Sequence, residues 1–414
     1  ISYSPTNTAV VEDYITGREF LLDYVGVDGE FRLLSMFDRY MSPGRGSAIN
    51  YSNVCLCPPA QINQYYEEAN PKILNMFKQL GFRDGLIFLQ GHTDGKKITF
   101  YDALNEFLHD DRLDVYVTGS NSRMLSSDIL TEFRGRGDEV RVHPLSFAEY
   151  WSAVGGDRRD AFPGYARFGG MPFCLFRPDD AARETYLRSL FSEVYVRDFV
   201  ERRRIERPDL LEKILDYLAS SVGSLTNPNN VARALEAAGD GASVHTVASY
   251  LSHIKDAFLF SEARRYDVKG RAYFSYPDKY YCEDLGLRNA RLSFRQPEIT
   301  HLTENAVYNE LVRRGHSVDV GVVTAVEKNA KGQSVRVPHE IDFIVNKEGE
   351  RVYVQSAYAI RSDEKLESER RAFSLAGDSF RKIIVRDDIL HRTFDETGVL
   401  HVNLLDFLLD ETIV

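Results

Sequence analysis

The run LDVYVTGSN at residues 113–121 is the stretch on which the fold prediction rests. Five mostly apolar residues followed by a polar turn are typical of a strand buried on both faces of a parallel sheet. Two earlier runs have the same form, FLLDYV at 20–25 and GLIFL at 85–89. After the first of them comes a Gly-rich turn and an apparent helix through Leu33 and Phe37. The alternation predicts a parallel α/β layer over residues 1–150, with ligands at the strand ends.

Residues 151–290 carry helical patterns instead. Three helices are predicted there: one with an apolar stripe at 210, 211, 214, 215 and 218, one over 230–238 and one over 243–258. Gly223 ends the first, and Ser243 is placed to cap the third. Two β-rich segments, 259–266 and 271–276, flank the turn VKG at 268–270. Three helices and a hairpin predict a winged helix-turn-helix.

The last third, residues 291–414, again has an α/β pattern. Helices are predicted over 304–314 and 365–371, and strands over 317–325, 340–345, 351–358 and 382–385. The sequence therefore predicts three domains, with boundaries near 150 and 290.

Composition limits the classes of function. The 414 residues exceed what one packed core usually holds. A formal net charge of −11 argues against a chain that coats nucleic acid by bulk charge. The four cysteines, of which only Cys55 and Cys57 are close together, form no disulfide framework or zinc pattern, so a cytoplasmic protein is expected. No run is long and apolar enough for a membrane helix, and no membrane partner is expected.

Several motifs together resemble a known family. They are VYVTGSNS at 115–122, EFRGRGDE at 132–139, PLSFAEY at 144–150, KYYCEDLGLRN at 279–289, ENAVY at 304–308 and EIDF at 340–343. In order and spacing these resemble the prokaryotic AAA-type ATPases that carry a winged helix and a C-terminal restriction-endonuclease-like domain. The resemblance covers residues 113–414 well and the first hundred residues only by strand order. Members of this family use ATP and Mg²⁺, but these cofactors are expected here only if the ATPase site is still active.

The phosphate loop that such an ATPase needs, G-x-x-x-x-G-K-[ST], does not occur in these 414 residues. The best positional candidate is the turn with Gly26 and Gly29, which follows an apolar strand. However, Glu30 stands where the lysine should be, and Phe31 replaces the hydroxyl. A carboxylate at this position repels a triphosphate. A second candidate, GHTDGKK at 91–97, is one residue short and lacks Ser or Thr.

Other parts of the ATPase site are incomplete as well. The strand ending at Leu89 continues into QGHT, where the family has adjacent carboxylates for Mg²⁺. Asn121 matches the position of a polar sensor of the γ-phosphate, and Arg134 or Arg136 resembles an arginine that reaches a neighbouring subunit's nucleotide. Without a nucleotide, Asn121 would cap the next helix, and the arginines would pair with nearby acids.

The C-terminal third resembles a nuclease fold whose metal site needs an acid on one strand and E-x-K or Q-x-K on the next. Asp342 occupies the first position, Glu304 a supporting helical one, and Gln355 the second strand. Ala357 stands where the lysine should be. One acid and one amide make a poor Mg²⁺ site, so a nuclease fold retained as a scaffold is expected rather than nuclease activity.

The winged helix offers two functions. DNA contact would use His245 on the third helix, with Arg264, Arg265, Lys269 and Arg271 reaching phosphates from the wing. The third helix has few basic residues, and winged helices also serve as protein docking modules.

The function predicted from the sequence is that of an AAA-type family member that has lost ATP hydrolysis and acts as a binding or assembly module. Its partner would be a protein or a second copy, with DNA as a further candidate. The alternative is an active ATPase with a non-standard phosphate loop. A nucleotide that raises the melting temperature would favour the alternative.

Overall fold

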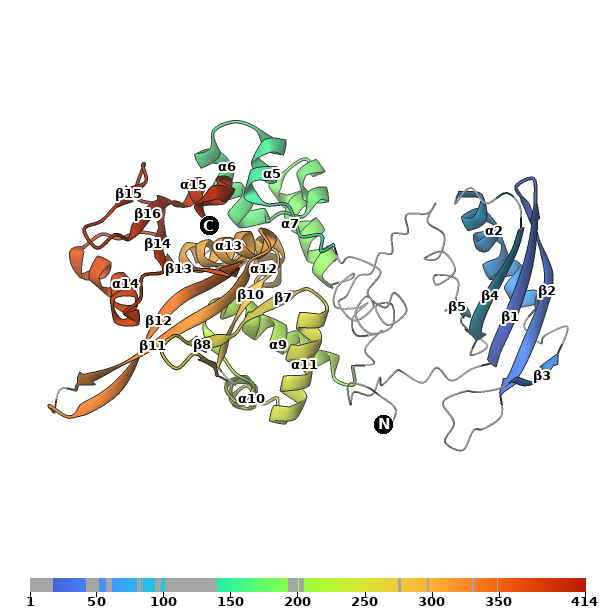
Figure 1. Cartoon of the computed structure of the whole chain (residues 1–414), viewed down its shortest axis with the longest axis horizontal. Helices are drawn as coiled ribbons and strands as arrows, with labels where there is room; N and C mark the ends of the chain where they lie inside the picture. The colour runs from blue at the N-terminus through green and yellow to red at the C-terminus, as the bar shows by residue number, and fades with distance from the viewer. Residues whose placement is uncertain are drawn as a thin grey trace. The chain divides into compact units, whose positions relative to one another are not determined.

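A computed structural model describes residues 18–41, 52–56, 62–79, 83, 85–93, 98–100, 140–192, 200, 205–274, 277–295, 298–329, 331–347 and 349–414. The chain divides into two compact units, Ile1–Glu139 and Val140–Val414 (Figure 1). Helices are combined with parallel and antiparallel strand pairs, which makes the protein a mixed α/β protein. The division into three domains stays a prediction. The run at 113–121 lies outside the described residues.

The first unit is a sheet with a helix against it. Its elements are β1 (Arg18–Val27), β2 (Glu30–Met41), β3 (Ser52–Leu56), α1 (Ile62–Gln64), the π-helical segment η1 (Tyr65–Ala69), α2 (Asn70–Gln79), β4 (Gly85–Thr93) and β5 (Ile98–Phe100). The strand order is β3-β2-β1-β4-β5, and every pairing is antiparallel. The strands predicted at 20–25 and 85–89 are confirmed, but the parallel arrangement is wrong for these five strands.

A tight hairpin explains the error. Asp28 and Gly29 connect β1 to β2 with φ angles of 54° and 84°, and Val27 pairs with Glu30. Strands joined by two residues can only be antiparallel, and an Asp-Gly pair favours this turn because both positions need positive φ. The helix predicted through Leu33 and Phe37 is therefore wrong, since both residues lie in β2.

A β-bulge makes β2 look helical in the sequence. Its register against β1 shifts where Asp23 pairs with Ser35 and Tyr24 pairs with Leu33. With the extra residue, Phe31 and Met36 are buried and Leu33 is partly buried on the same face. That spacing mixes steps of two and three residues, which resembles a helical stripe more than a strand.

Helix α2 covers one face of this sheet (Figure 1). The Phe77 ring lies 5.1 Å from that of Tyr24 and 4.9 Å from that of Phe31. The Tyr24 hydroxyl donates to Oδ1 of Asn70 over 2.5 Å and also contacts the hydroxyl of Tyr65. Burial raises the pKa of Tyr24 to about 12, so the phenol stays protonated and can make these hydrogen bonds.

The second unit begins with a helical layer of α5 (Phe147–Val154), α6 (Arg158–Phe168), the 3₁₀ helix η3 (Pro172–Phe176) and α7 (Asp180–Ser189). Ser146 and Glu149 form a capping box that starts α5. The end of α6 is fixed by Asp284, whose Oδ2 accepts from the Gly170 N–H over 2.6 Å. Gly169 has a φ of +69°, and a Cβ there would lie 2.2 Å from Oδ1 of Asp284. Only glycine fits at this position.

The helices predicted in the middle of the chain are confirmed. They are α9 (Pro208–Ser220), α10 (Pro228–Ala237) and α11 (Val244–Asp256). The apolar stripe of α9 is buried, and Gly223 follows the helix with a φ of +72°. The Ser243 side chain caps α11 by accepting from the Thr246 N–H. Beside these helices is a three-stranded sheet of order β6-β10-β7, made of β6 (Leu225–Thr226), β7 (Phe260–Ala263) and β10 (Asp278–Cys282).

The predicted hairpin around residues 268–270 is confirmed as the antiparallel pair β8 (Arg265–Asp267) and β9 (Ala272–Tyr273). It does not extend the three-stranded sheet. Instead, β8 pairs in parallel with β11 (Ser317–Lys328), so the hairpin forms the edge of the C-terminal sheet.

That C-terminal sheet has eight strands in the order β15-β16-β14-β13-β12-β11-β8-β9. Its further elements are α12 (Leu285–Arg291), α13 (Ile299–Arg313), β12 (Ser334–Lys347), β13 (Glu350–Ser356), α14 (Asp363–Ala376), β14 (Arg381–Arg386), β15 (Thr393–Phe394), β16 (Leu400–Asn403), α15 (Leu404–Leu409) and the 3₁₀ helix η5 (Glu411–Ile413). Strands β13, β14 and β16 are parallel, and β12 is antiparallel to its neighbours. Val352 and Val354 face the cluster that includes α13, whereas Tyr353 between them faces α14. Because successive side chains of β13 point to opposite faces of the sheet, helices cover both faces of this strand.

Candidate functional site

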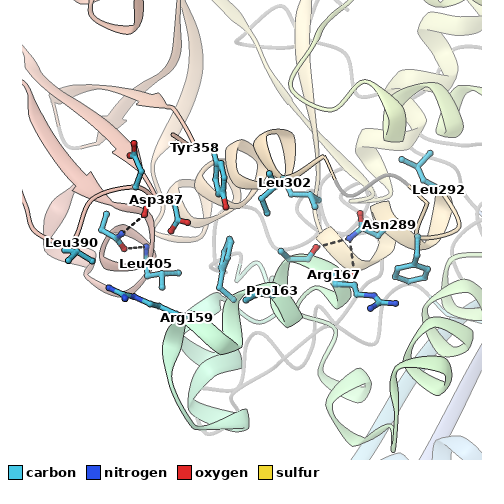
Figure 2. A pocket seen from close by; sticks show the side chains of 16 residues that line it. Arg159, Pro163, Arg167, Asn289, Leu292, Leu302, Tyr358, Asp387, Leu390 and Leu405 are labelled. Carbon is cyan, nitrogen blue, oxygen red and sulfur yellow. Dashed lines mark hydrogen bonds between the residues drawn. The ribbon is translucent and has the colours of Figure 1, made fainter. Parts of the chain in front are cut away.

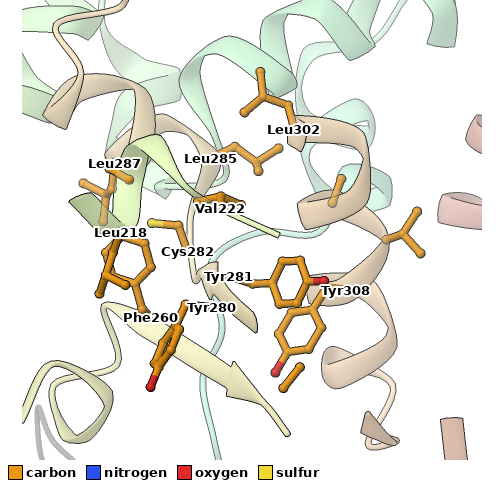
Figure 3. Close-up of a cluster of buried hydrophobic side chains, with 14 of the residues drawn as sticks. Leu218, Val222, Phe260, Tyr280, Tyr281, Cys282, Leu285, Leu287, Leu302 and Tyr308 are labelled. Carbon is orange, nitrogen blue, oxygen red and sulfur yellow. The ribbon is translucent and has the colours of Figure 1, made fainter. Parts of the chain in front are cut away.

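One strand lies between the helical middle and the C-terminal sheet. All five residues of β10 are buried. Tyr280 and Cys282 join the core shown in Figure 3. Tyr281 stacks on Tyr308 of α13 with centroids 4.2 Å apart. Lys279 lies two residues before Tyr281 and so shares its face of the strand.

Lys279 meets three carboxylates, and these four residues are called the Lys279 cluster. Its Nζ lies 2.7 Å from Oε1 of Glu340, 3.0 Å from Oε1 of Glu304 and 3.5 Å from Oδ1 of Asp342. The Lys279 side chain is 5% exposed, and those of Glu304 and Asp342 are nearly as buried, whereas Glu340 is about one third exposed. The Tyr281 hydroxyl donates to the same oxygen of Glu304 over 2.7 Å. The ammonium group is thus held from several sides.

A second bulge lies at Asp342 of β12. The register of β11 against β12 shifts between Asp319, which pairs with Ile344, and Gly321, which pairs with Ile341. Two residues of β12, one of them Asp342, therefore oppose a single residue of β11. Glu340 and Asp342 lie two residues apart on β12 and so can face the same ammonium group, and the bulge interrupts the ladder with β11 at Asp342.

The remaining polar atoms around Asp342 are committed to the sheet. Its Oδ2 accepts from the N–H of Ser356 over 2.9 Å. Its own N–H donates to Oε1 of Gln355 over 3.2 Å. The amide oxygen that a metal would need from Gln355 is therefore used as a backbone acceptor.

Electrostatics favour a charged lysine. Burial would lower the pKa of Lys279, but the charges of Glu304, Asp342 and Glu340 outweigh it and raise that pKa. Burial raises the pKa of Glu304 to about 7, with Lys279 opposing and Asp342 adding to the rise. An ammonium ion that stays charged at neutral pH offsets part of the repulsion among the acids.

The residues present do not suit a nuclease metal ion. Lys279 already neutralises Glu304 and Asp342, and Ala357, where the family's lysine is expected, is buried in the core beside α14. Among the described residues, no group of three or more His, Cys, Asp or Glu is arranged to hold a metal ion. The Lys279 cluster is therefore an ion-pair network.

The nuclease-like residues named from the sequence thus come together. Glu304, Asp342 and Gln355 are all in or beside the Lys279 cluster. Two members were not assigned a role, although both lie inside quoted motifs. Glu340 could have been found, because it precedes Asp342 by two residues. No sequence signal pointed to Lys279, because it lies near the carboxylates only through the packing of β10 against α13 and β12.

The structure describes only part of the proposed nucleotide residues. Gly26, Gly29 and Glu30 lie in the β1–β2 hairpin, with Glu30 at the start of a strand instead of a helix. Asn121, Arg134 and Arg136 lie outside the described residues, as do residues 94–97 of the second candidate loop. Its ends, β4 and β5, pair antiparallel, so this segment connects two strands. Cys55 lies in β3, and Cys57 is outside the description.

The proposed DNA-contacting residues are spread over two elements. His245 is exposed in the first turn of α11. Lys269 and Arg271 are exposed in the β8–β9 turn. The Arg264 guanidinium lies 4.3 Å from the centroid of the Tyr273 ring, and that of Arg265 lies 5.2 Å from the Phe274 ring. Both arginines are thus partly engaged at the sheet edge.

Comparisons with known proteins find two family matches. Residues 67–151 match the family model described as AAA domain, so this segment is similar to AAA domains. Residues 159–298 match a domain of unknown function, DUF8612. An uncharacterised protein of Haemophilus influenzae is 31% identical over 301 residues, which are 72% of this chain and 71% of the relative. The chain belongs to the same family as that protein.

More distant similarities extend to archaea. An uncharacterised protein of Methanocaldococcus jannaschii is 24% identical over 288 residues, and the match covers 67% of this chain and 62% of that protein. Among solved structures, protein VC1899 of Vibrio cholerae matches at 14% identity with a TM-score of 0.19, over 66% of this chain and 62% of that one. So low a TM-score carries no argument about the fold. No helix in the described part of the chain is both long and apolar enough to cross a membrane.

Proposed function

We propose that this AAA-type family member has lost ATP hydrolysis and works as a cytoplasmic binding or assembly module. In this proposal, α9 to α11 with the β6-β10-β7 sheet form a winged helix, and the C-terminal sheet is a nuclease-like fold retained as a scaffold. The observation that carries it is the Lys279 cluster, in which an ammonium ion takes the place of a metal ion. The cluster ties β10 of the middle region to α13 and β12 of the C-terminal region.

The first unit supports the loss of ATP hydrolysis. The best candidate phosphate loop is a two-residue β-turn whose N–H groups belong to a hairpin. A phosphate cradle needs successive N–H groups that point at the ligand from a loop and the start of a helix. The Glu30 carboxylate follows directly and is exposed, so it adds repulsion.

A protein partner or a second copy is favoured over DNA. In the last turn of α11, Lys255 is paired with Glu262 over 2.6 Å. The first turn offers Val244 and His245 as its exposed side chains, with no arginine or lysine. Few phosphate contacts mean weak electrostatic binding. DNA remains a partner to be tested through Lys269 and Arg271.

The experiment pairs ligand binding with activity. The native protein is titrated with ATP, ADP, Mg²⁺ and Mn²⁺ in thermal-shift assays, and phosphate release and DNA cleavage are measured beside it. We expect no shift and no turnover. We also expect Mn²⁺ to raise the melting temperature of Lys279→Met and to leave the native protein unchanged, because the variant exposes acids that the ammonium ion had neutralised.

Two results would contradict the proposal. A thermal shift at micromolar nucleotide with phosphate release would establish the active ATPase. Mn²⁺-dependent cleavage by the native protein, abolished in Asp342→Asn, would show that the nuclease-like site still works.

A further inference from the structure

A cavity of about 680 Å³ lies within the second unit, away from the Lys279 cluster (Figure 2). Helix α6, the α12–α13 region and the loops after the parallel strands form its walls. Strand β13 ends two residues before Tyr358, β14 ends directly before Asp387, and β16 ends at Asn403. Parallel strands bind ligands at their carboxyl ends, and the volume is in the range of small-molecule sites.

The walls are apolar over much of the cavity. Phe162 and Leu302 are buried, and Pro163, Leu292, Phe294 and Ile299 complete this lining. In Figure 2, Pro163 and Leu302 lie between Arg159 and Asp387 on one side and Leu292 on the other. Arg159 and Asp387 thus lie together on one side of this apolar lining, and Arg167 and Asn289 lie near Leu292.

Most polar groups that line the cavity are already used. Asn289 donates to two carbonyl groups of α6, and Asn403 donates to the Ile389 carbonyl over 2.6 Å. Asp388 accepts from Arg386 and from the Ile360 N–H. Arg167 is paired with Glu184 over 2.8 Å. These groups shape the wall and leave little hydrogen-bonding capacity for a ligand.

Asp387 and Arg159 differ from them. Asp387 is half-buried, and apart from the Tyr358 hydroxyl bond its carboxyl oxygens have lone pairs to spare. Burial raises the pKa of Asp387, and the charge of Arg159, which lines the same cavity, partly opposes this rise. The Arg159 guanidinium forms no hydrogen bond or ion pair within the part of the chain that the structure describes. The cavity is thus lined by two opposite charges that are not paired with each other.

We propose that this cavity binds an α-amino acid with a large apolar side chain. The ammonium group of the ligand would donate to Asp387, and its carboxylate would accept from Arg159, because a zwitterionic head matches two opposite charges that are not joined to each other. The side chain would lie against Phe162, Pro163 and Leu302. The proposal does not depend on the state of the Lys279 cluster.

Calorimetric titration of the full chain tests the proposal with L-leucine, L-phenylalanine and L-tryptophan. Affinity should rise in this order, since burial of apolar area grows with the side chain. Asp387→Asn and Arg159→Met should each weaken L-phenylalanine binding at least tenfold. The matched control Arg371→Met, at an arginine outside the cavity lining that is paired with Glu327, should leave the affinity unchanged.

Single-charge probes separate the two contacts. Phenethylamine lacks the carboxylate, so its binding should be insensitive to Arg159→Met and sensitive to Asp387→Asn. For 3-phenylpropanoate the order should reverse. No binding of any amino acid at millimolar concentration would overturn the proposal, and so would binding that neither variant weakens. Circular dichroism of each variant establishes that it is folded.

Discussion

Replacing Lys279 with methionine removes the ammonium ion from among three carboxylates while keeping the volume of the side chain. At an effective dielectric constant of about 20, unit charges about 3 Å apart attract by roughly 5 kcal/mol, and desolvation offsets part of this. The interaction of Lys279 with Glu340 is left out of this sum, because the Glu340 side chain is about one third exposed and solvent screens its charge. Glu304 and Asp342 stay buried without a cation. We expect a loss of about 3–5 kcal/mol in the free energy of unfolding at pH 8.

The pKa of Glu304 determines how the stability loss of Lys279→Met changes with pH. Burial already raises the pKa of Glu304 to about 7, and loss of Lys279 raises it further. A folded state that binds a proton more tightly than the unfolded state loses stability as pH rises. The penalty of Lys279→Met should therefore be larger at pH 8 than at pH 5.5, where Glu304 is protonated.

Urea unfolding at both pH values measures the effect. The triple variant Lys279→Met, Glu304→Gln, Asp342→Asn should recover at least half of the loss, because no buried charge remains. The exposed Lys331→Met serves as the control and should change stability by less than about 0.5 kcal/mol. A loss below about 1 kcal/mol for Lys279→Met, equal at both pH values, would refute the charge-compensation argument.

Three further predictions concern single positions. Burial raises the pKa of Asp278 to about 6, so the proton bound in the folded state stabilises the protein fully below pH 4, and this stabilisation is lost as pH rises through 6. The free energy of unfolding of Asp278→Asn in urea, relative to that of the native protein, should therefore rise by about 1 kcal/mol from pH 5 to pH 7.5. A difference that stays constant with pH would contradict this. Gly169→Ala should lower the free energy of unfolding by at least about 3 kcal/mol, because the new Cβ clashes with Asp284. Gly239→Ala is also at positive φ but has nothing within 4 Å, so it should cost about 1 kcal/mol. Equal changes in melting temperature would exclude the clash. The Asn289 side chain donates to two α6 carbonyl oxygens over 2.9 and 3.0 Å, and Asn289→Ala removes both hydrogen bonds. We expect a loss of about 2 kcal/mol in stability, measured by the same thermal assay. An unchanged melting temperature would contradict this.

Local patterns predicted local structure well. The stripe of α9 and the Ser243 cap of α11 are interactions within one helix, so the sequence alone specifies them. The β2 strand failed because its bulge is set by pairing with β1. The β8–β9 hairpin was found, but its pairing with β11 joins segments about fifty residues apart, and no local pattern encodes such a contact.

The site followed the same rule. Glu304, Asp342 and Gln355 could be named because they occupy expected positions in sequence motifs, and the structure brings them together. Lys279 could not, since a lysine on an apolar strand is normally expected at the surface. Its burial becomes intelligible only once β10 is placed against α13 and β12.

The position of Lys279 also defines the register of β10. Buried ion pairs contribute little net stability, and their best-attested role is to exclude alternative arrangements. A slip of β10 by one residue would bring either Asp278 or Tyr280 to the carboxylates. Asp278 would add a fourth acid, and Tyr280 would leave Glu304 and Asp342 without a cation. Both alternatives are costly, so the lysine favours a single register of β10 against the C-terminal sheet, and this is the reason to retain these acids that the proposed scaffold role supplies.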